Sequence, residues 1–150
     1  MINIMPMRQT QPTTMPHAKP TILLIDDSPD NLQILGDILS EAGYEVMFAE
    51  SGLSGLERTR FMKPDLILMD VRMPGIDGLD ACRTFKEQDD VQDIPVVLMS
   101  AQRGGTLRQE ALNAGSLDCW EKPLSPDFLR ETLKSLLPLS GSVQAEDLIS

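Results

Sequence analysis

Short, unbroken apolar runs recur along the chain and are separated by longer segments with helical spacing. Three of these runs are continuous over four residues, and two further candidates are weaker. Continuous runs are typical of strands that other elements cover on both faces of the sheet. The pattern therefore predicts five strands, near residues 22–25, 46–48, 66–69, 96–99 and 117–120.

Five helical patterns lie between and after these runs, and two of them share a start signal. Ser28-Pro29 and Ser125-Pro126 each place a capping residue before a proline, which is favoured at the first helical position. We expect the apolar residues at helical spacing to form the core face of each helix, with Phe61 as the weakest member: Leu32, Leu35, Leu39, Leu53, Leu56, Phe61, Leu79, Cys82, Phe85, Leu107, Ala111, Leu112, Phe128, Leu129, Leu133, Leu136 and Leu137.

Strands and helices alternate along the chain, and a new strand begins every 20 to 30 residues. This is the spacing of the right-handed crossover units that build a parallel sheet. The predicted fold is α/β: a doubly wound, five-stranded parallel sheet flanked by five helices. We expect one folded domain over residues 20–138, a disordered tail over 1–19, and a short tail or linker over 139–150.

Composition and charge exclude several classes of function. The net charge of −10 argues against direct nucleic-acid binding. The chain has no apolar run of the roughly 20 residues that span a bilayer and no export signal, so we expect a cytoplasmic protein without membrane contact. Cys82 and Cys119 are expected to be reduced core thiols, and His17 in the tail is expected to have no role.

Polar residues follow the predicted strands at one edge of the sheet. Asp26 and Asp27 follow the first strand, Asp70 the third and Ser100 the fourth, while Lys122 comes after the fifth. Because parallel strands all end at the same edge, we expect these side chains to converge in one crevice. Helix capping alone could explain a single aspartate, but it does not account for the whole set.

Three converging carboxylates repel one another, and one lysine offsets only one of their charges. The remaining charge calls for a hard cation such as Mg²⁺, which prefers oxygen ligands. A cation, a lysine and a hydroxyl around a carboxylate form a constellation that can bind a phosphoryl group and accept it on the carboxylate. Spacing alone leaves open which of the three aspartates is the nucleophile.

Six fragments, in order and at matching spacing, make the chain similar to a known family. They are Ile-Asp-Asp-Ser (25–28), Gly-Tyr-Glu-Val (43–46), Pro-Asp-Leu-Ile-Leu-Met-Asp (64–70), Met-Pro-Gly-Ile-Asp-Gly (73–78), Met-Ser-Ala (99–101) and Lys-Pro (122–123). Together they resemble the CheY-like receiver domain of two-component response regulators, which has a flavodoxin-like fold. The resemblance covers residues 20 to 138.

The resemblance implies roles for individual residues. Asp70 would accept a phosphoryl group from a phosphohistidine on a sensor histidine kinase or a histidine phosphotransfer protein. Asp27, Asp70 and the backbone carbonyl of Arg72 would bind Mg²⁺ directly, and Asp26 would act mainly through water. Ser100 would be the switch hydroxyl, and Lys122 would pair with the phosphoryl group. The chain would then catalyse only its own phosphorylation and dephosphorylation, and it is not expected to be an enzyme.

The sequence departs from the family at the switch aromatic, which usually lies three residues before the lysine. Cys119 occupies that position, and Trp120 follows it. One interpretation is that Trp120 simply packs between the sheet and a helix; the other is that it replaces the moving ring. In the family, the residues at the positions of Arg72 and Gln102 also shape the lifetime of the phosphorylated state.

The output would be a change of the face formed by the fourth helix, fifth strand and fifth helix, which would bind a downstream protein or a second copy. We place on it Arg108, Gln109, Asn113, Cys119, Arg130 and Lys134. Two alternatives are a magnesium-dependent phosphatase and a protein-binding module that is not phosphorylated. The phosphatase is disfavoured because Arg72 stands where such enzymes usually carry a second aspartate.

Overall fold

The computed structural model describes residues 19–102 and 104–139, and its centre is one parallel sheet of five strands. The strand order is β2-β1-β3-β4-β5, and each neighbouring pair is parallel. The predicted doubly wound α/β fold is confirmed. Each strand begins and ends within one or two residues of its expected position. The strands are β1 Thr21–Ile25, β2 Glu45–Ala49, β3 Leu66–Asp70, β4 Val96–Ser100 and β5 Asp118–Glu121.

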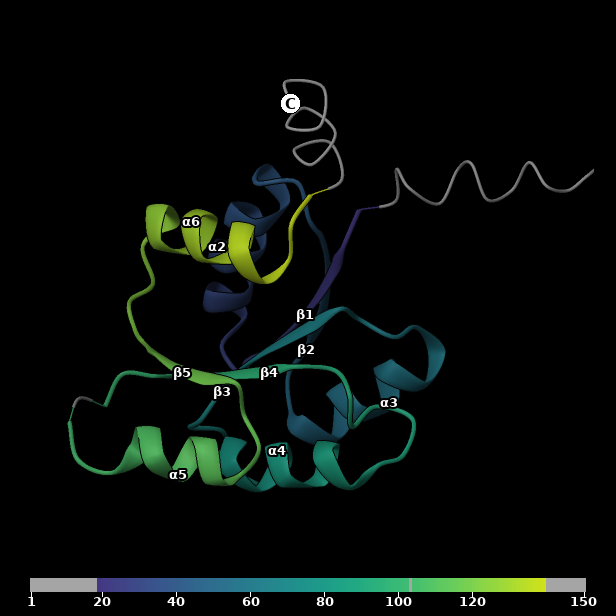
Figure 1. Cartoon of the computed structure of the whole chain (residues 1–150), viewed down its shortest axis with the longest axis vertical. Coiled ribbons are helices and arrows are strands. Elements are labelled where there is room, and N and C mark those ends of the chain that lie inside the picture. The colour runs from purple at the N-terminus through teal and green to yellow at the C-terminus, as the bar shows by residue number, and fades with distance from the viewer. Residues whose placement is uncertain (1–18, 103, 140–150) are drawn as a thin grey trace, which may run out of the picture.

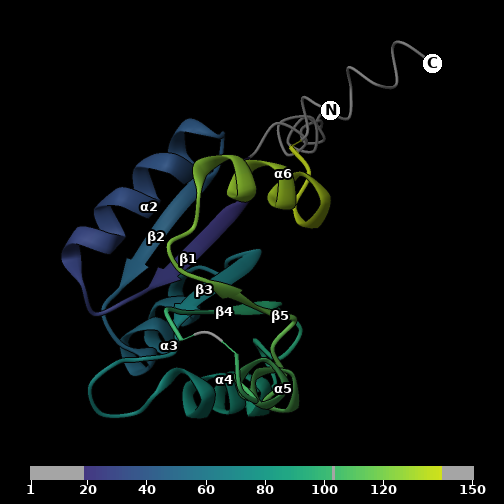
Figure 2. The ribbon, with the colours of Figure 1, turned by 90° about the vertical axis from the view of Figure 1, so that its left-hand side faces the viewer.

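Helices cover both faces of the sheet and divide the core into two layers (Figures 1 and 2). On one face, α2 (Pro29–Glu41) and α6 (Pro126–Leu136) enclose a cluster that includes Leu24, Leu39 and Trp120. On the other face, α3 (Gly52–Phe61), α4 (Gly78–Glu87) and α5 (Leu107–Asn113) enclose a cluster that includes Ile25 and Phe85. Alternate residues of β1 therefore enter opposite layers, as the two-residue period of a strand requires.

Both predicted serine–proline start signals form helix caps. The Ser28 hydroxyl accepts a hydrogen bond from the Asn31 backbone N–H at 3.3 Å, and the Ser125 hydroxyl accepts one from Phe128 N–H at 3.0 Å. Proline follows each cap within the first turn. Each cap satisfies a backbone donor that has no partner inside the helix, which fixes where α2 and α6 begin.

The predicted core face of the helix at 52–61 was right for Leu56, which is buried, and wrong for Leu53 and Phe61. Leu53 and Phe61 are 67% and 92% exposed, whereas the buried positions are Gly52, Gly55, Leu56 and Thr59. A side-chain carbon at Gly55 would lie only 2.4 Å from Ile25 Cδ1, so α3 contacts the sheet through its glycines. The apolar pattern alone could not reveal a helix that packs through residues without side chains. Three other predicted core residues are exposed rather than buried: Leu112, Phe128 and Leu136.

Cys82 and Cys119 are both free thiols, as expected; Cys82 is buried and Cys119 is half-buried. His17, most of the predicted N-terminal tail and residues 140–150 lie outside the described residues. Leu139 still packs against the α2–α6 cluster. Within residues 19–102 and 104–139, every helix is too short or too polar to cross a membrane.

Gly78 is the position where an added methyl group should cost most near the sheet edge. A side-chain carbon there would lie 2.5 Å from the Asp70 carbonyl oxygen and 2.7 Å from Val71 Cα, both backbone atoms. We expect Gly78→Ala to lower the free energy of unfolding by about 1–3 kcal/mol, because backbone atoms must move to make room. Urea denaturation should measure this loss, while Glu87→Ala, at the exposed end of the same helix, stays within about 0.5 kcal/mol of wild type. Equal stability of the two variants would contradict the expected clash.

Candidate functional site

The strand order brings two distant parts of the chain together at the carboxyl edge of the sheet. β1 pairs with β3, with Ile25 in register with Met69, so Asp26 and Asp70 extend side by side from adjacent strands. The order of strands reverses at this pair, and such reversal points are where open α/β sheets bind their ligands. Asp26 is 1% exposed and Asp70 is 7% exposed.

The three predicted carboxylates do converge. One carboxylate oxygen from each of Asp26, Asp27 and Asp70 lies within 4.8 Å of the other two, and Asp27 is the exposed member. Lys122 reaches them from the end of β5: its Nζ lies 3.2 Å from Asp26 Oδ2 and 3.4 Å from Asp70 Oδ1. The donor set is all oxygen and carries more negative charge than one lysine neutralises, so the cluster could bind a hard divalent cation.

Burial raises the pKa of the Asp70 carboxyl above its ordinary value, and the nearby Asp26 charge raises the pKa further. The Lys122 ammonium and a hydrogen bond from the Arg72 backbone oppose this rise without cancelling it. The mutual repulsion expected from the sequence therefore acts at Asp70. A charge that is unfavourable in the isolated protein becomes favourable once a cation approaches it.

Asn31 belongs to this site although it was missed in the sequence. Its side-chain Nδ2 donates to Asp26 Oδ2 at 3.3 Å, while Asp26 Oδ1 accepts the Ser28 backbone N–H at 2.9 Å. A signal was available, because side chains in the first turn of a helix lean back toward its N-terminus. An asparagine just inside the helix that follows Asp26-Asp27 is therefore within reach of those carboxylates.

Ser100 ends β4, next to the strand that carries Asp70, and it is buried. Its hydroxyl oxygen accepts a hydrogen bond from the Gln102 backbone N–H at 2.9 Å, and its carbonyl accepts the Lys122 backbone N–H at 2.8 Å. The Lys122–Pro123 peptide bond is cis. Ser100 and Lys122 are thus linked through the backbone beside the carboxylates.

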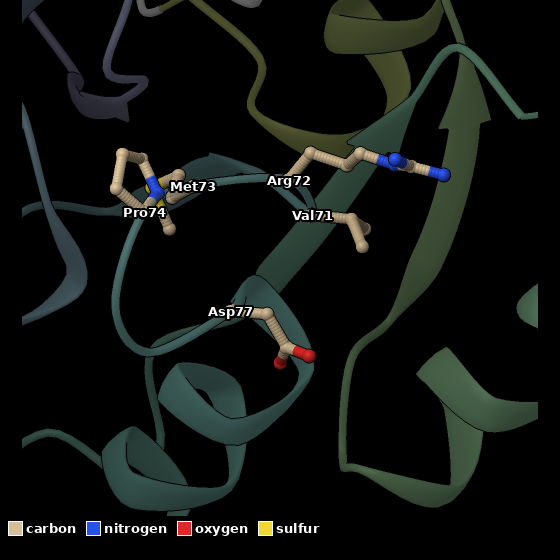
Figure 3. Close-up of a pocket in the computed structure, with 5 residues that line it drawn as sticks. All are labelled: Val71, Arg72, Met73, Pro74 and Asp77. Atoms are coloured by element: carbon tan, nitrogen blue, oxygen red, sulfur yellow. The ribbon is translucent and has the colours of Figure 1, made fainter.

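Arg72 and the residues after it line a hollow of about 460 Å³ on the loop between β3 and α4 (Figure 3). The Arg72 side chain extends away from Asp77, toward the neighbouring strands. Asp77 caps α4 by accepting the Asp80 backbone N–H at 2.9 Å. Arg72 is exposed, so its guanidinium contributes no buried compensation to the carboxylate cluster.

Cys119 and Trp120 lie on opposite faces of β5. Cys119 packs against the cluster under α5, whereas Trp120 is 5% exposed and belongs to the cluster under α6. The Trp120 ring meets Phe128 edge-on with centroids 5.2 Å apart, and its N–H donates to Asp118 Oδ2 at 3.2 Å. Trp120 therefore packs between the sheet and a helix, on the side away from the position that Cys119 holds.

Comparison with known proteins agrees with this geometry. The sequence profile described as the response regulator receiver domain matches residues 22–134. The chain belongs to this family. One similar protein is the polar-differentiation response regulator DivK of Brucella anthropi, which is 31% identical over 120 residues. The match covers 78% of this chain and 95% of DivK, so DivK is little longer than the matched receiver.

Solved receiver structures share the fold. The chemotaxis protein CheY4 of Vibrio cholerae has a TM-score of 0.74 and 29% identity, covering 80% of this chain and 100% of the CheY4 chain. The histidine-protein kinase BarA of Escherichia coli K12 is 34% identical over 121 residues, or 81% of this chain but 13% of BarA. The chain thus spans a small part of the length of BarA.

The raised pKa of Asp70 predicts a pH dependence of stability in metal-free buffer. Because the pKa of Asp70 is higher in the folded protein than its ordinary value of 3.8, protonation of Asp70 favours the folded state. This contribution to the stability of the fold is fully present below pH 3.8 and is lost as the pH rises through the folded-state pKa. Asp70→Asn cannot ionise, so we expect it to melt at a higher temperature than wild type at pH 7, by a margin that narrows toward pH 4. Thermal melts with a chelator present measure this margin. Asp93→Asn, at an exposed carboxylate, should track wild type, and identical curves for Asp70→Asn and wild type would refute the expectation.

Proposed function

We propose that this receiver takes a phosphoryl group from a phosphohistidine onto Asp70 and thereby switches a protein-binding face. An Asp70 carboxylate oxygen attacks phosphorus, the phosphorus–nitrogen bond breaks, and the released imidazole nitrogen takes a proton from solvent. Hydrolysis reverses the state: water attacks phosphorus, the bond to Asp70 breaks, and inorganic phosphate leaves with a proton passing to solvent. The observation that carries the proposal is the convergence of Asp26, Asp27, Asp70 and Lys122 at the strand-order reversal.

The transfer is proposed to require Mg²⁺, which would neutralise negative charge between the carboxylates and the incoming phosphoryl oxygens. Asp27, Asp70 and the Arg72 carbonyl would bind it directly. Asp26 would act through water, because both of its oxygens already accept hydrogen bonds or ion pairs from the protein. In this arrangement Asp27 and Asp70 would be the carboxylate ligands of the ion, and Asp26 would remain a buried source of negative charge.

Lys122 and Ser100 are proposed to bind two phosphoryl oxygens. Lys122 Nζ is already 3.4 Å from Asp70 Oδ1, so a short movement would bring it to a group attached to that carboxylate. The Ser100 hydroxyl, now held by Gln102 N–H, would exchange that partner for a phosphoryl oxygen. Because the Lys122 N–H bonds to the Ser100 carbonyl, the two movements would be coupled through one backbone contact.

The donor would approach along an apolar groove of about 360 Å³ beside Lys122. Ile34 in this groove is 57% exposed, and a phosphohistidine must arrive on a partner protein that can cover such side chains. The groove joins the first turns of α2 to the loop after β5, and it is lined by Asn31, Ile34, Leu35, Ala101, Lys122, Pro123 and Leu124.

The output face is proposed to lie on α5, β5 and α6. Arg108 on α5 pairs with Asp118 at 2.8 Å, and a hollow of about 520 Å³ beside this pair is lined in part by Trp120 and Phe128. The other expected residues are largely satisfied within their own helices: Gln109 bonds to Asn113, Arg130 pairs with Asp127, and Lys134 pairs with Glu131. A downstream protein or a second copy would bind here.

Chemical phosphorylation tests the acceptor. With acetyl phosphate and Mg²⁺, we expect intact-mass spectrometry to find one added phosphoryl group on wild type and none on Asp70→Asn, because an amide cannot form the acyl phosphate. Asp93→Asn should match wild type. Lys122→Ala should slow the uptake by about a hundredfold or more, because it removes a cation that opposes the developing charge.

The control outcomes separate the alternatives. A chelator should abolish uptake by wild type. Uptake that persists in Asp70→Asn would assign the acceptor to another residue, and no uptake in folded wild type would favour the binding module that is not phosphorylated. Turnover of a general phosphate ester would instead support the phosphatase.

The single tryptophan tests whether Trp120 is a moving ring. Because Trp120 packs on the face opposite Cys119, we expect its emission maximum to stay unchanged when beryllofluoride and Mg²⁺ occupy the site. Steady-state fluorescence measures this, with Asp70→Asn as the control that should not bind beryllofluoride. A shift to longer wavelength in wild type, absent in Asp70→Asn, would show that the ring leaves its packed position and would favour the moving-ring hypothesis.

A further inference from the structure

Asp26, Ser28 and Asn31 form a closed ring of three hydrogen bonds at the start of α2. Ser28 N–H donates to Asp26 Oδ1 at 2.9 Å, Asn31 N–H donates to the Ser28 hydroxyl at 3.3 Å, and Asn31 Nδ2 donates to Asp26 Oδ2 at 3.3 Å. The helix cap thus holds the amide in place, and the amide in turn holds the carboxylate. Hydrogen bonds from Ser28 and Asn31, both close to Asp26 in the sequence, therefore orient its carboxylate in addition to the contact with Lys122.

Asp26 Oδ2 has a second partner, which is Lys122. The ammonium lies 3.2 Å from this oxygen and 3.4 Å from Asp70 Oδ1, so two buried carboxylates share it. If Lys122 moves toward a phosphoryl group on Asp70, it must leave Asp26 Oδ2 at least in part. A buried carboxylate oxygen without a donor is unfavourable, and this cost would oppose the phosphorylated state.

The amide of Asn31 removes that cost. It stays on Asp26 Oδ2 when the ammonium departs, and, being neutral, it does not repel a cation held by Asp27 and Asp70 as a second lysine would. On the basis of the proposed function, we propose that Asn31 is a positioning residue: it keeps Asp26 satisfied while Lys122 exchanges that carboxylate for the phosphoryl group.

Binding of beryllofluoride isolates this exchange from chemistry, because the reagent mimics the phosphoryl group without transfer. Isothermal titration calorimetry would measure Mg²⁺ affinity alone and then beryllofluoride affinity at saturating Mg²⁺. In Asn31→Ala we expect beryllofluoride affinity to fall by about fivefold or more, the loss of one hydrogen bond to a charged group. Affinity for Mg²⁺ alone should change less, because Lys122 still bonds to Asp26 in that state.

Two further variants make the test specific. Asn31→Leu keeps the size of the side chain, suits the apolar groove beside it, and lacks the donor hydrogens, so it should show the same selective loss. Gln33→Ala removes another amide from the same helix, one that bonds to Asp37 at 3.0 and 3.2 Å on the exposed side, and should bind both ligands as wild type does. Circular dichroism melts would establish that each variant is folded at the titration temperature.

Each outcome decides the question. Unchanged beryllofluoride affinity in a folded Asn31 variant overturns the inference, and so does an equal loss of Mg²⁺ and beryllofluoride affinity, which would mean that Asn31 serves the metal alone. Both of these results leave the proposed function intact. Failure of wild type to bind beryllofluoride at all would instead overturn the proposed function and this inference with it.

Discussion

Two buried carboxylates share one ammonium group, and the chemistry of the site follows from that imbalance. Asp26 and Asp70 are nearly inaccessible, and Lys122 lies between them at 3.2 and 3.4 Å. An ionised carboxylate in such a place is stable only when partners compensate its charge. With Asp27 beside them, a single lysine does not neutralise all of the negative charge, and burial together with the Asp26 charge raises the pKa of Asp70. A divalent ion is the compensation that an oxygen-only donor set fits best.

Hydrogen bonds hold the backbone next to Asp70 on both sides. Val71 N–H donates to the Met99 carbonyl at 2.9 Å, and Gly78 N–H donates to the Val71 carbonyl at 2.8 Å. Gly78 also approaches the Asp70 carbonyl too closely for any side chain. The end of β3 is thus fixed from both sides, so under the proposed function other groups would have to move when the charge at Asp70 changes. Lys122 and the loop after Ser100 are the neighbours with partners to exchange.

Features that depend on neighbouring residues in the chain could be predicted from the sequence, whereas most contacts between helices and strands could not. The caps at Ser28 and Ser125 depend on their own turns, and the continuous strands depend on burial, so both could be located. The burial of α3 through Gly55 depends on how closely the helix approaches Ile25, and no pattern of apolar residues encodes that distance. In the site, the strand order expected from the sequence predicted which carboxylates meet. The hydrogen bond from Asn31 to Asp26 was recognised only in the structure.

Under the proposed function, Cys119 at position 119 would weaken the link between the site and the output face. Cys119 stands where the family usually carries an aromatic ring. Among the described residues, an ion pair between Arg108 and Asp118 joins α5 to β5, and the Asp118 carboxylate also accepts the Trp120 N–H. The guanidinium is two-thirds exposed, and an ion pair in that setting contributes only about 0–1 kcal/mol. Under the proposed switch, a movement of Lys122 would reach α5 through this weak ion pair and α6 through the packed Trp120–Phe128 pair. A partner that binds the proposed output face would then have to supply most of the free energy that separates the two states, by contacts that it makes in only one of them.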